Sequence, residues 1–392
     1  MDNIFPTETE KKIIEKYKEN NAATIALKLK DKENLRSRYV VTQIKGYQTI
    51  KRKMPLWTTY NIVYPQHLPL EQCSSVTTAE YKTVIIKRNL ANFDSFVDLT
   101  GGFGVDFYVI SYFFKQALYI DQNNELCEIV KHNFNIFGRS NTKFMTSDSV
   151  DFITNTNQKF NLIFIDPARR DIAGKKIIMI EDCKPNIANL QDVIIQKTEL
   201  AMIKLSPMLD ITDCISKIKN ISEINIVAVN NECKEIVLVI KKDFCNNPHI
   251  FTFCDGISFD FYLNDEKNCE IDFFSNENLI GKHLYEPDAA IMKAGAFKTV
   301  AKKYNLKKLH PSSHLYISDF EIKNFPGRHF IIMQTGKPKD FAGITANLTV
   351  RNFPEKADVL KKKLKIKDGG DIYLFATTLY NNKKIFIHAE KK

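Results

Sequence analysis

The chain has 392 residues, of which 44% are hydrophobic and 26% are charged, a composition typical of a globular protein with two or three domains. No apolar run reaches the length of a membrane span, and the eight cysteines form no CxxC pair, so the composition favours neither a membrane protein nor a zinc ribbon. The basic charge is concentrated in residues 291–392, which carry 21 Lys and Arg against 8 Asp and Glu. This excess indicates a region that binds a polyanion, and a lysine-rich solvated surface is the alternative.

The first residues lack the basic and apolar regions of a secretory signal peptide. Scattered cysteines in a chain of this length are typical of reduced thiols. We therefore expect a cytoplasmic protein with no membrane partner. We also expect no metal, because His310 and His314 flank Pro311 in a predicted loop without a third ligand nearby in the sequence.

Residues 1–75 are predicted to form an N-terminal helical region and a connector. Thr7 and Glu10 have the spacing of a capping box, which predicts a helix start. Further helices are expected over residues 22–29 and 35–50.

The connector is predicted to be extended over residues 54–72, because three prolines interrupt this stretch. Thr77 and Glu80 then repeat the capping-box spacing and predict a helix that runs to about Asn89.

Residues 76–245 are predicted to form one α/β domain, because strand-like and helix-like segments alternate there. The stretch between the last two strands is too short for a crossover helix, so the final strand is predicted to lie antiparallel to its neighbour. The seven predicted strands are 95–99, 117–120, 142–145, 161–165, 200–204, 224–229 and 236–240.

The remainder is predicted to form small α+β modules, one over residues 246–315 and a basic one over residues 316–392. Residues 250–254 and 258–263 alternate like a hairpin. A helix is expected within residues 286–303, and a second, lysine-rich helix near residues 355–364.

The most informative segment is the glycine loop that follows the first strand of the α/β domain, over residues 96–104. Gly101, Gly102 and Gly104 lack a Cβ atom, so a ligand can approach the main chain closely before the next helix begins. A nicotinamide-binding fingerprint needs a further glycine that is absent here.

Acidic residues follow successive strands of the predicted sheet. Asp121 ends the second strand, where a carboxylate can accept both ribose hydroxyls of a nucleoside. Asp148 follows the third strand, where an acid can cap the next helix. Asp166 and Pro167 follow the fourth strand, at the edge of the sheet where ligands bind.

Asp98-x-Thr100-x-Gly102-x-Gly104 resembles motif I of the class I S-adenosylmethionine-dependent methyltransferases, with Thr100 in place of the first glycine. The stretch from Asn161 to Arg170 resembles motif IV of the same family. Over nearly its whole length the chain is similar to bacterial class I methyltransferases with a THUMP-like C-terminal domain, through residues 64–81, 285–290 and 350–354 as well.

This resemblance implies a Rossmann-like methyltransferase sheet, S-adenosyl-L-methionine as the cofactor, and a ferredoxin-like segment before the THUMP-like one. The residues that it assigns to the cofactor are Gln72, Ser75, Asp98, Thr100, Gly101, Gly102, Gly104, Asp121, Gln122, Asp148, Ser149 and Asp166. Of these, Gln72 and Ser75 belong to a polar segment that could reach the methionine end. Asp148 corresponds to the acid that contacts the adenine in this family, a role that is compatible with capping a helix.

The catalytic residues are predicted to be Asp166, Pro167 and Arg169. Asp166 would align the cofactor or accept a hydrogen bond from the substrate nucleophile, since methyl transfer depends mainly on orientation. Arg169 and its neighbour Arg170 suit an anionic substrate, or form surface salt bridges. The stretch from Ile203 to Met208, which ends the fifth strand, lies at the same edge of the sheet.

The motifs do not name the acceptor atom. Motif IV continues with Ala168 and lacks the aromatic residue that grips a flipped adenine, and neither Cys183 nor Cys214 lies in a nucleophile motif. We expect an RNA methyltransferase, acting on tRNA or rRNA that the basic C-terminal region binds. The alternatives are a methyltransferase of small molecules or proteins and a catalytically silent RNA-binding protein.

Overall fold

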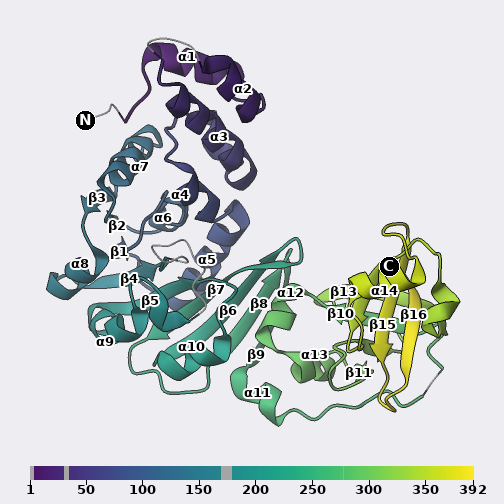
Figure 1. Ribbon diagram of the computed structural model, residues 1–392. Coiled ribbons are helices and arrows are strands. Elements are labelled where there is room, and N and C mark those ends of the chain that lie inside the picture. The colour runs from purple at the N-terminus through teal and green to yellow at the C-terminus, as the bar shows by residue number, and fades with distance from the viewer. Residues whose placement is uncertain (1–3, 31–34, 169–178, 277) are drawn as a thin grey trace. The chain divides into compact units, whose positions relative to one another are not determined.

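The computed structural model describes residues 4–30, 35–168, 179–276 and 278–392. The chain forms two compact units, Met1–Ser222 with Lys234–Asn246, and Glu223–Cys233 with Asn247–Lys392 (Figure 1). No helix in the described ranges is long and apolar enough to cross a membrane.

The first unit begins with three helices, α1 (Glu8–Tyr17), α2 (Ala22–Leu29) and α3 (Ser37–Lys53), drawn in purple in Figure 1. They share a small apolar core, to which Ile25 and Ile44 contribute. The predicted capping box is confirmed: the hydroxyl of Thr7 accepts a hydrogen bond from the Glu10 nitrogen, and Glu10 Oε2 accepts one from the Thr7 nitrogen at 2.8 Å.

The extended connector predicted over residues 54–72 is wrong. Two short helices lie there, η1 (Pro55–Thr59) and α4 (His67–Gln72). Pro55 is the first residue of η1, a position where a helix needs no donor from the main chain, so this proline starts a helical turn and does not prevent one. Trp57 of η1 is buried and packs edge-on against Phe103.

Helix α5 (Val76–Asn89) begins two residues earlier than the sequence pattern predicted. Its cap is Ser75, whose hydroxyl accepts a hydrogen bond from the Thr78 nitrogen, while the Thr78 hydroxyl accepts one from the Ser75 nitrogen at 3.0 Å. The capping box of Thr77 and Glu80 was therefore wrong. The same three-residue spacing occurs twice here, and spacing alone does not choose between the two.

Nine strands of the described chain form one sheet, in the order β3-β2-β1-β4-β5-β7-β6-β8-β9. Its strands β1 to β5 are parallel, and β7 pairs with β5 in the antiparallel sense, which confirms the predicted reversal. The strands of the first unit are β1 (Ser95–Asp98), β2 (Gln116–Asp121), β3 (Thr142–Thr146), β4 (Phe160–Ile165), β5 (Thr198–Leu205) and β7 (Glu232–Lys241).

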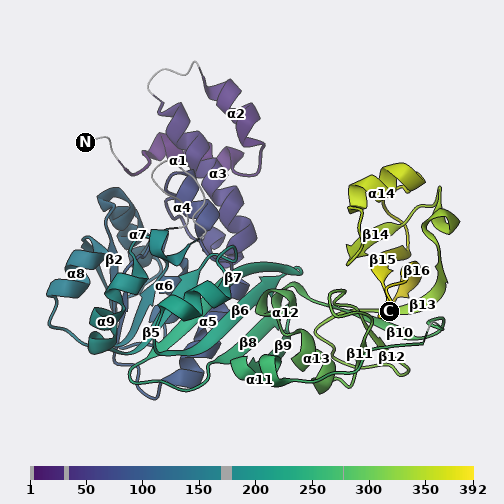
Figure 2. The same ribbon diagram turned by 60° about the horizontal axis from the view of Figure 1, so that its bottom comes forward.

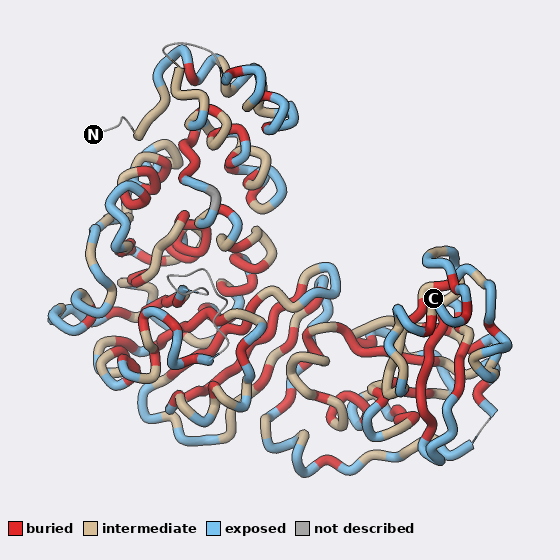
Figure 3. Tube along the Cα trace, viewed as in Figure 1, coloured by how far each residue is buried: buried red, intermediate tan, exposed pale blue. Residues whose placement is uncertain are grey.

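Crossover helices join the parallel strands and bury the central ones, which are red in Figure 3. All carboxyl ends of the parallel strands therefore face the same edge of the sheet. The helical segments after β1 are α6 (Val105–Ser111), α7 (Asn124–Ile136), α8 (Ser149–Asn155), η2 (Ile180–Asp182), α9 (Ile187–Lys197) and α10 (Ile211–Lys217).

The second unit contains β6 (Ile221–Val229), which is parallel to β8 (His249–Cys254). Strand β9 (Ile257–Tyr262) is antiparallel to β8, so the predicted hairpin is confirmed. A short helix, α11 (Leu263–Asn268), follows.

A second sheet, of seven strands in the described chain, has the order β11-β12-β10-β13-β16-β15-β14 (Figure 2). The helix predicted within residues 286–303 is two helices, and Glu286 and Pro287 belong to the strand before them. The elements are β10 (His283–Pro287), α12 (Ala289–Ala294), α13 (Phe297–Lys303), β11 (Lys307–Lys308), β12 (Tyr316–Ser318), β13 (Gly327–Gly336), η3 (Pro338–Phe341), β14 (Asn347–Arg351), α14 (Ala357–Leu364), β15 (Ile372–Thr378) and β16 (Lys384–Lys391).

A buried carboxylate connects distant strands of this second sheet. Glu286 of β10 is only 1% exposed. Its Oε2 accepts a hydrogen bond from Arg328 Nε on β13, and its Oε1 accepts one from Arg351 Nε on β14, each at 2.9 Å. The lysine-rich helix α14 packs over one part of the sheet, where Leu360 and Leu364 are buried.

Candidate active site

A cavity of about 610 Å³ lies at the carboxyl edge of the first sheet, within the first unit. This is the size of a site for a small molecule or cofactor. The loops after β1, β2, β3 and β4 line it, as does the segment that ends α4. Of the predicted site residues, those in the lining are Gln72, Asp98, Thr100, Gly101, Gly102, Gly104, Asp121, Gln122, Asp148, Ser149 and Asp166.

The glycine loop after β1 leaves no room for a side chain at Gly101. A Cβ atom on Gly101 would lie 2.0 Å from the Tyr119 ring, and Gly104 has a left-handed φ of 81° at the start of α6. The buried Tyr119 hydroxyl donates a hydrogen bond to the Gly102 carbonyl at 2.6 Å and fixes the loop against β2. The loop therefore presents main chain to the cavity.

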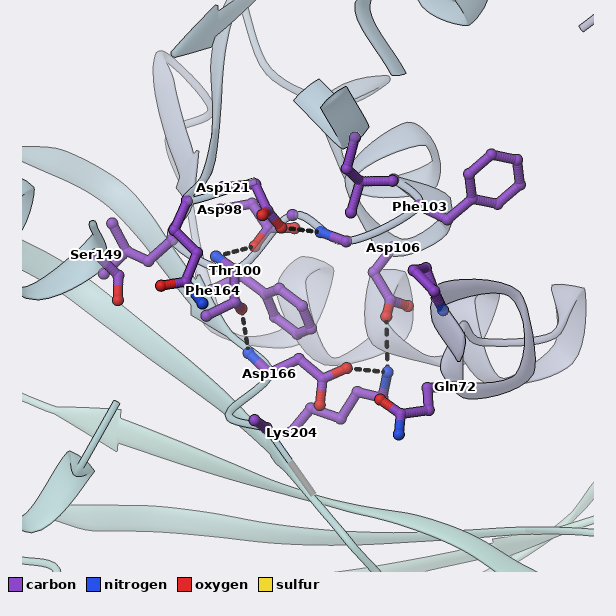
Figure 4. A pocket seen from close by; sticks show the side chains of 18 of the residues that line it. Gln72, Asp98, Thr100, Phe103, Asp106, Asp121, Ser149, Phe164, Asp166 and Lys204 are labelled. Atoms are coloured by element: carbon purple, nitrogen blue, oxygen red, sulfur yellow. Dashed lines mark hydrogen bonds and ion pairs between the residues drawn. The ribbon is translucent and has the colours of Figure 1, made fainter. Parts of the chain in front are cut away.

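Two carboxylates hold the loop through hydrogen bonds to its main chain, which Figure 4 marks with dashed lines. Asp98 accepts a hydrogen bond from the Thr100 nitrogen at 3.0 Å, and Asp121 Oδ2 accepts one from the Gly102 nitrogen at 3.0 Å. Burial raises the pKa of both carboxyl groups, strongly for Asp98, although these hydrogen bonds oppose the change.

Asp148 caps α8 and also lines the cavity, so the two predicted roles are compatible. Its Oδ1 accepts hydrogen bonds from the nitrogens of Val150 and Asp151, at 2.7 and 3.1 Å. The next residue, Ser149, lines the same wall.

Asp166 joins the loop after β4 to the glycine loop. Its main-chain nitrogen donates a hydrogen bond to the Thr100 hydroxyl at 2.6 Å. Its Oδ2 is 2.6 Å from Lys204 Nζ, whereas its buried Oδ1 has no partner in the described part of the chain. An unsatisfied carboxylate oxygen in a cavity is a ready acceptor for a ligand donor.

Asp166 is the first of five charged side chains that form a row of ion pairs with alternating sign. Lys204 Nζ is also 3.2 Å from Asp106 Oδ2, and Lys82 Nζ is 3.0 Å from Asp106 Oδ1 and 2.5 Å from Glu235 Oε1. Lys82 and Lys204 are at most 1% exposed. If all five are ionised, three carboxylates face two ammonium groups, which leaves one negative charge in excess.

Burial and neighbouring charges shift the pKa values of the carboxylates in this row in different directions. Burial opposes ionisation of Asp106, but the charges of Lys204 and Lys82 outweigh it and hold the pKa of Asp106 below its ordinary value. Burial raises the pKa of Glu235, although Lys82 acts in the opposite direction. Asp106 is thus the ionised centre between the two lysines.

Sequence reasoning did not assign Lys82, Asp106, Lys204 or Glu235 to the site. Two signals were available, since Lys204 interrupts the apolar run of β5 and Lys82 lies on the buried side of α5. A charged residue at a core position is seldom fully buried without a partner.

Comparisons with known proteins identify the C-terminal domains and the fold of the chain. A family model described as a ferredoxin-like domain matches residues 283–326, and one described as THUMP domain-like matches residues 338–391. The crystal structure of a "putative methyltransferase from Porphyromonas gingivalis W83" is similar over 98% of this chain and 97% of that one, with 29% identity and a TM-score of 0.83. By fold, this chain is a class I methyltransferase, and its C-terminal segment is THUMP-like.

Other solved structures resemble only part of this methyltransferase. A "putative methyltransferase" from Streptococcus mutans "in complex with SAH" covers 42% of it and 96% of its own length, with 11% identity and a TM-score of 0.33. An "rRNA Methylase" from Streptococcus thermophilus covers 42% of it and 95% of its own length, with 11% identity and a TM-score of 0.32. A comparison with curated proteins gave no match.

The cofactor of class I methyltransferases is S-adenosylmethionine, and the residues of the cavity fit it. A Cβ atom on Gly102 would lie near only one atom, the Thr100 carbonyl oxygen at 3.8 Å, so the turn is open toward the cavity. Asp166 Oδ1 accepts no hydrogen bond from the described residues, so it can accept one from a ligand. Asp121 lies in the same lining, and a carboxylate at this position can accept hydrogen bonds from ribose hydroxyls.

Two predicted site residues lie outside the cavity lining, and a third is outside the described residues. Ser75 caps α5 and is not among the described residues that line the cavity, where Ser74 lies instead. Pro167 is buried and also does not line it. Arg169, with Arg170, lies outside the described residues. Within the described ranges, no group of three or more His, Cys, Asp or Glu residues could hold a metal.

Proposed function

We propose that this methyltransferase transfers the methyl group of S-adenosylmethionine to RNA, and that exposed lysines of residues 316–392 bind the RNA. The observation that carries the proposal is the coexistence of the acid-and-glycine cavity in the first unit with a basic, THUMP-like segment in the same chain. A cytoplasmic location is part of the proposal and agrees with eight free cysteines in the chain.

On the cofactor side, the proposal gives Asp121 the ribose hydroxyls and Asp148 with Ser149 the adenine. The glycine loop would contact the middle of the cofactor through its main chain. Gln72 and Asp98 would face the methionine end. Each assignment follows from a residue's position in the lining and from the chemistry of its side chain.

On the acceptor side, Asp166 is proposed to align the nucleophile with the methyl carbon. Methyl transfer is an in-line displacement, so the residues mainly contribute orientation and exclusion of water. Asp166 is suited to this role because two bonds fix it, one through its nitrogen and one through Oδ2. Its second oxygen remains available to a substrate donor.

Exposed lysines near α14 support the RNA part of the proposal. Some of the charge there is internal, since Lys361 pairs with Asp368 and Lys363 with Glu355. Tyr373 packs on Phe330 and is only half exposed, so it is a poor platform for stacking a base. The exposed basic residues of this segment include Lys337, Lys339, Lys356, Lys362, Lys365 and Lys367.

The methyl-transfer part is tested with radiolabelled S-adenosylmethionine and the full-length protein. Total RNA, protein and small-molecule fractions from cells lacking this protein serve as acceptors. We expect label in the RNA fraction, and we expect Asp166→Ala to abolish transfer while retaining cofactor binding. A matched control is Asp94→Ala, because Asp94 is exposed and pairs with Lys115 away from the cavity. Label only in protein or small molecules would refute the RNA substrate.

The docking part is tested by replacing four exposed lysines with glutamine in the full chain, at positions 356, 362, 365 and 367. Phosphate contacts release counterions, so each lost contact should flatten the plot of log affinity against log salt by about 0.7 to 0.9. The control replaces four exposed lysines of the first unit, Lys12, Lys16, Lys87 and Lys159. If the control loses RNA binding and the first variant does not, RNA binds the first unit and the proposed docking site in residues 316–392 is wrong.

A further inference from the structure

We propose that the acceptor atom is a hydroxyl oxygen, the ribose 2′-hydroxyl of the RNA, and that Lys204 accepts its proton during transfer. The inference rests on the proposed function and adds the chemical class of the acceptor. It starts from the geometry of Asp166, Lys204 and Asp106, which Figure 4 shows side by side.

Lys204 is in position to reach a substrate. It is the penultimate residue of β5, its side chain lines the cavity, and its Nζ is 2.6 Å from Asp166 Oδ2. An acceptor hydroxyl that donates to Asp166 therefore comes within reach of the same nitrogen. A solvated surface lysine would be mobile, but Lys204 is 1% exposed and is fixed between Asp166 and Asp106.

The chemistry of a hydroxyl acceptor calls for such a group. A neutral hydroxyl is a weak nucleophile and must lose its proton as it attacks, whereas an aromatic amine or ring nitrogen brings its own lone pair. Among the ordinary side chains, a lysine amine freed of its proton by burial or by a neighbouring cation is a strong base. In the transfer the oxygen bonds to the methyl carbon, the carbon–sulfur bond breaks with its electron pair on sulfur, and the hydroxyl proton goes to Nζ.

The two neighbouring carboxylates favour the ammonium form of Lys204 before the methyl donor binds, so the proposal requires the bound donor to shift this balance. When Lys204 holds the proton, Asp106 and Asp166 stabilise the ammonium group on two sides. When a cationic methyl donor is bound, its charge disfavours a second cation nearby and promotes the neutral amine. The titratable groups around Lys204 are Asp166 after β4, Asp106 on α6, Lys82 on α5, Glu235 on β7, Asp98 on β1 and Cys73 after α4.

Lys82 and Glu235 act as positioning residues. Lys82 holds Asp106 from the side opposite to Lys204, and Glu235 in turn holds Lys82. Without them, the orientation of Asp106 would depend on Lys204 and on the Ser74 hydroxyl, which donates to Asp106 at 2.8 Å, so Lys204 would be held less firmly.

The cavity is poorly equipped for the alternative acceptors. Its described lining contains two phenylalanines, Phe103 and Phe164, which are 2% and 1% exposed, so neither offers a free face to a flipped base. Carbon methylation of pyrimidines needs an activated cysteine. Burial raises the pKa of the Cys73 thiol, which instead donates to the Leu70 carbonyl.

The experiment uses the full-length protein, labelled cofactor and RNA, followed by digestion and mass spectrometry of the nucleosides. We expect the methyl group on ribose, in linkages that resist alkaline hydrolysis. Lys204→Arg keeps the positive charge but supplies no base, so it should bind cofactor and RNA as wild type does while kcat falls about 10²- to 10⁴-fold at every pH. Wild-type kcat should rise with pH and then level off.

A rescue experiment separates proton transfer from a structural role. Lys204→Ala should regain part of its kcat when ethylamine is added, and a set of amines should restore activity in the order of their basicity. Lys115→Met is the control, because Lys115 loses the same charge at an exposed position. Thermal melting and cofactor titration establish that the variants are folded.

The outcomes distinguish the two proposals. Methyl groups on bases, or full activity in folded Lys204→Arg, would overturn the hydroxyl acceptor and leave RNA methylation standing. No methyl transfer to any RNA by the wild-type protein would overturn the proposed function and this inference with it. Ribose methylation together with amine rescue supports both.

Discussion

The hydroxyl of Thr100 accepts a hydrogen bond from the main-chain nitrogen of Asp166, over 2.6 Å. Thr100 occupies the position of a glycine in motif I, and its hydroxyl accepts a hydrogen bond that a glycine could not accept. It ties the loop after β1, which we propose to contact the cofactor, to the loop after β4, which we propose to contact the acceptor. The departure from the motif is thus a direct link between the two halves of the site.

Replacing Thr100 with valine should loosen this link at nearly constant volume. We expect the loss of about 1 kcal/mol, the usual net value of one hydrogen bond, and a fall in kcat of about fivefold. Thr100→Ser keeps the hydroxyl and should stay near wild type. Steady-state kinetics with varied RNA concentration check this, and equal losses in both variants would argue against the hydrogen bond.

Replacing Asp121 with alanine should weaken binding of S-adenosylmethionine by about 1–3 kcal/mol, because charged hydrogen bonds to the ribose are lost. The same change also frees the Gly102 nitrogen that Asp121 holds. Asp121→Asn retains one acceptor oxygen and should lose less. Calorimetric titration of both variants measures the difference, with NADH as a competing ligand that we expect not to bind.

Replacing Lys82 with methionine should destabilise the first unit by about 3–5 kcal/mol, because Glu235 and Asp106 would remain buried without their shared cation. The double variant Lys82→Met with Glu235→Leu should recover part of this loss. Denaturant unfolding of the wild type, both single variants and the double variant gives the coupling energy. Simple additivity of the two changes would mean that the pair contributes nothing.

The pair of Glu10 and Arg36 predicts a specific response to acid. The hydrogen bond from Arg36 lowers the pKa of Glu10 from 4.5 to about 2, although burial opposes it. A lowered pKa in the folded state stabilises the protein above pH 4.5, and this contribution is lost as the pH falls from 4.5 toward 2. Arg36→Met should therefore lower the melting temperature at pH 7. The difference in melting temperature between this variant and the wild type should be smaller at pH 3.5 than at pH 7.

The expected size of that effect at pH 7 is about 1.5 kcal/mol, the low end for a charged hydrogen bond, because the Arg36 side chain is 34% exposed. Glu10→Gln preserves the capping box and serves as the control for helix α1. A gap that stays constant from pH 7 to 3.5 would mean that Glu10 does not control acid stability.

Most of the first sheet could be predicted from the sequence because its information is local. The apolar runs before Asp98, Asp121 and Asp166 mark parallel strands whose carboxyl ends must share an edge, so these acids were expected together. The reversal of the last strand followed from the short polar stretch before it. The glycine loop could be predicted because glycine is the residue that tolerates its left-handed turns and close contacts.

The rest of the site depends on contacts between distant residues. Lys82 and Glu235 are 153 positions apart and meet only when α5 packs beside β7, which no local pattern encodes. Ser75 was expected in the cavity, but the choice between Ser74 and Ser75 depends on where α5 begins, and two capping boxes competed for that start. Local spacing predicts that a helix starts nearby, whereas the packed structure decides at which residue.

Glu286, finally, changes how the second unit can be divided. In a flat sheet, β10 and β14 would be about 19 Å apart, four strand spacings, yet Arg351 reaches Glu286 at 2.9 Å. The sheet must therefore curl toward a half-open barrel, closed at this point by an ion triad. The ferredoxin-like and THUMP-like segments each supply part of that triad, Glu286 from the former and Arg351 from the latter. A boundary drawn between them cuts a single folding unit, and neither half is a natural fragment for expression.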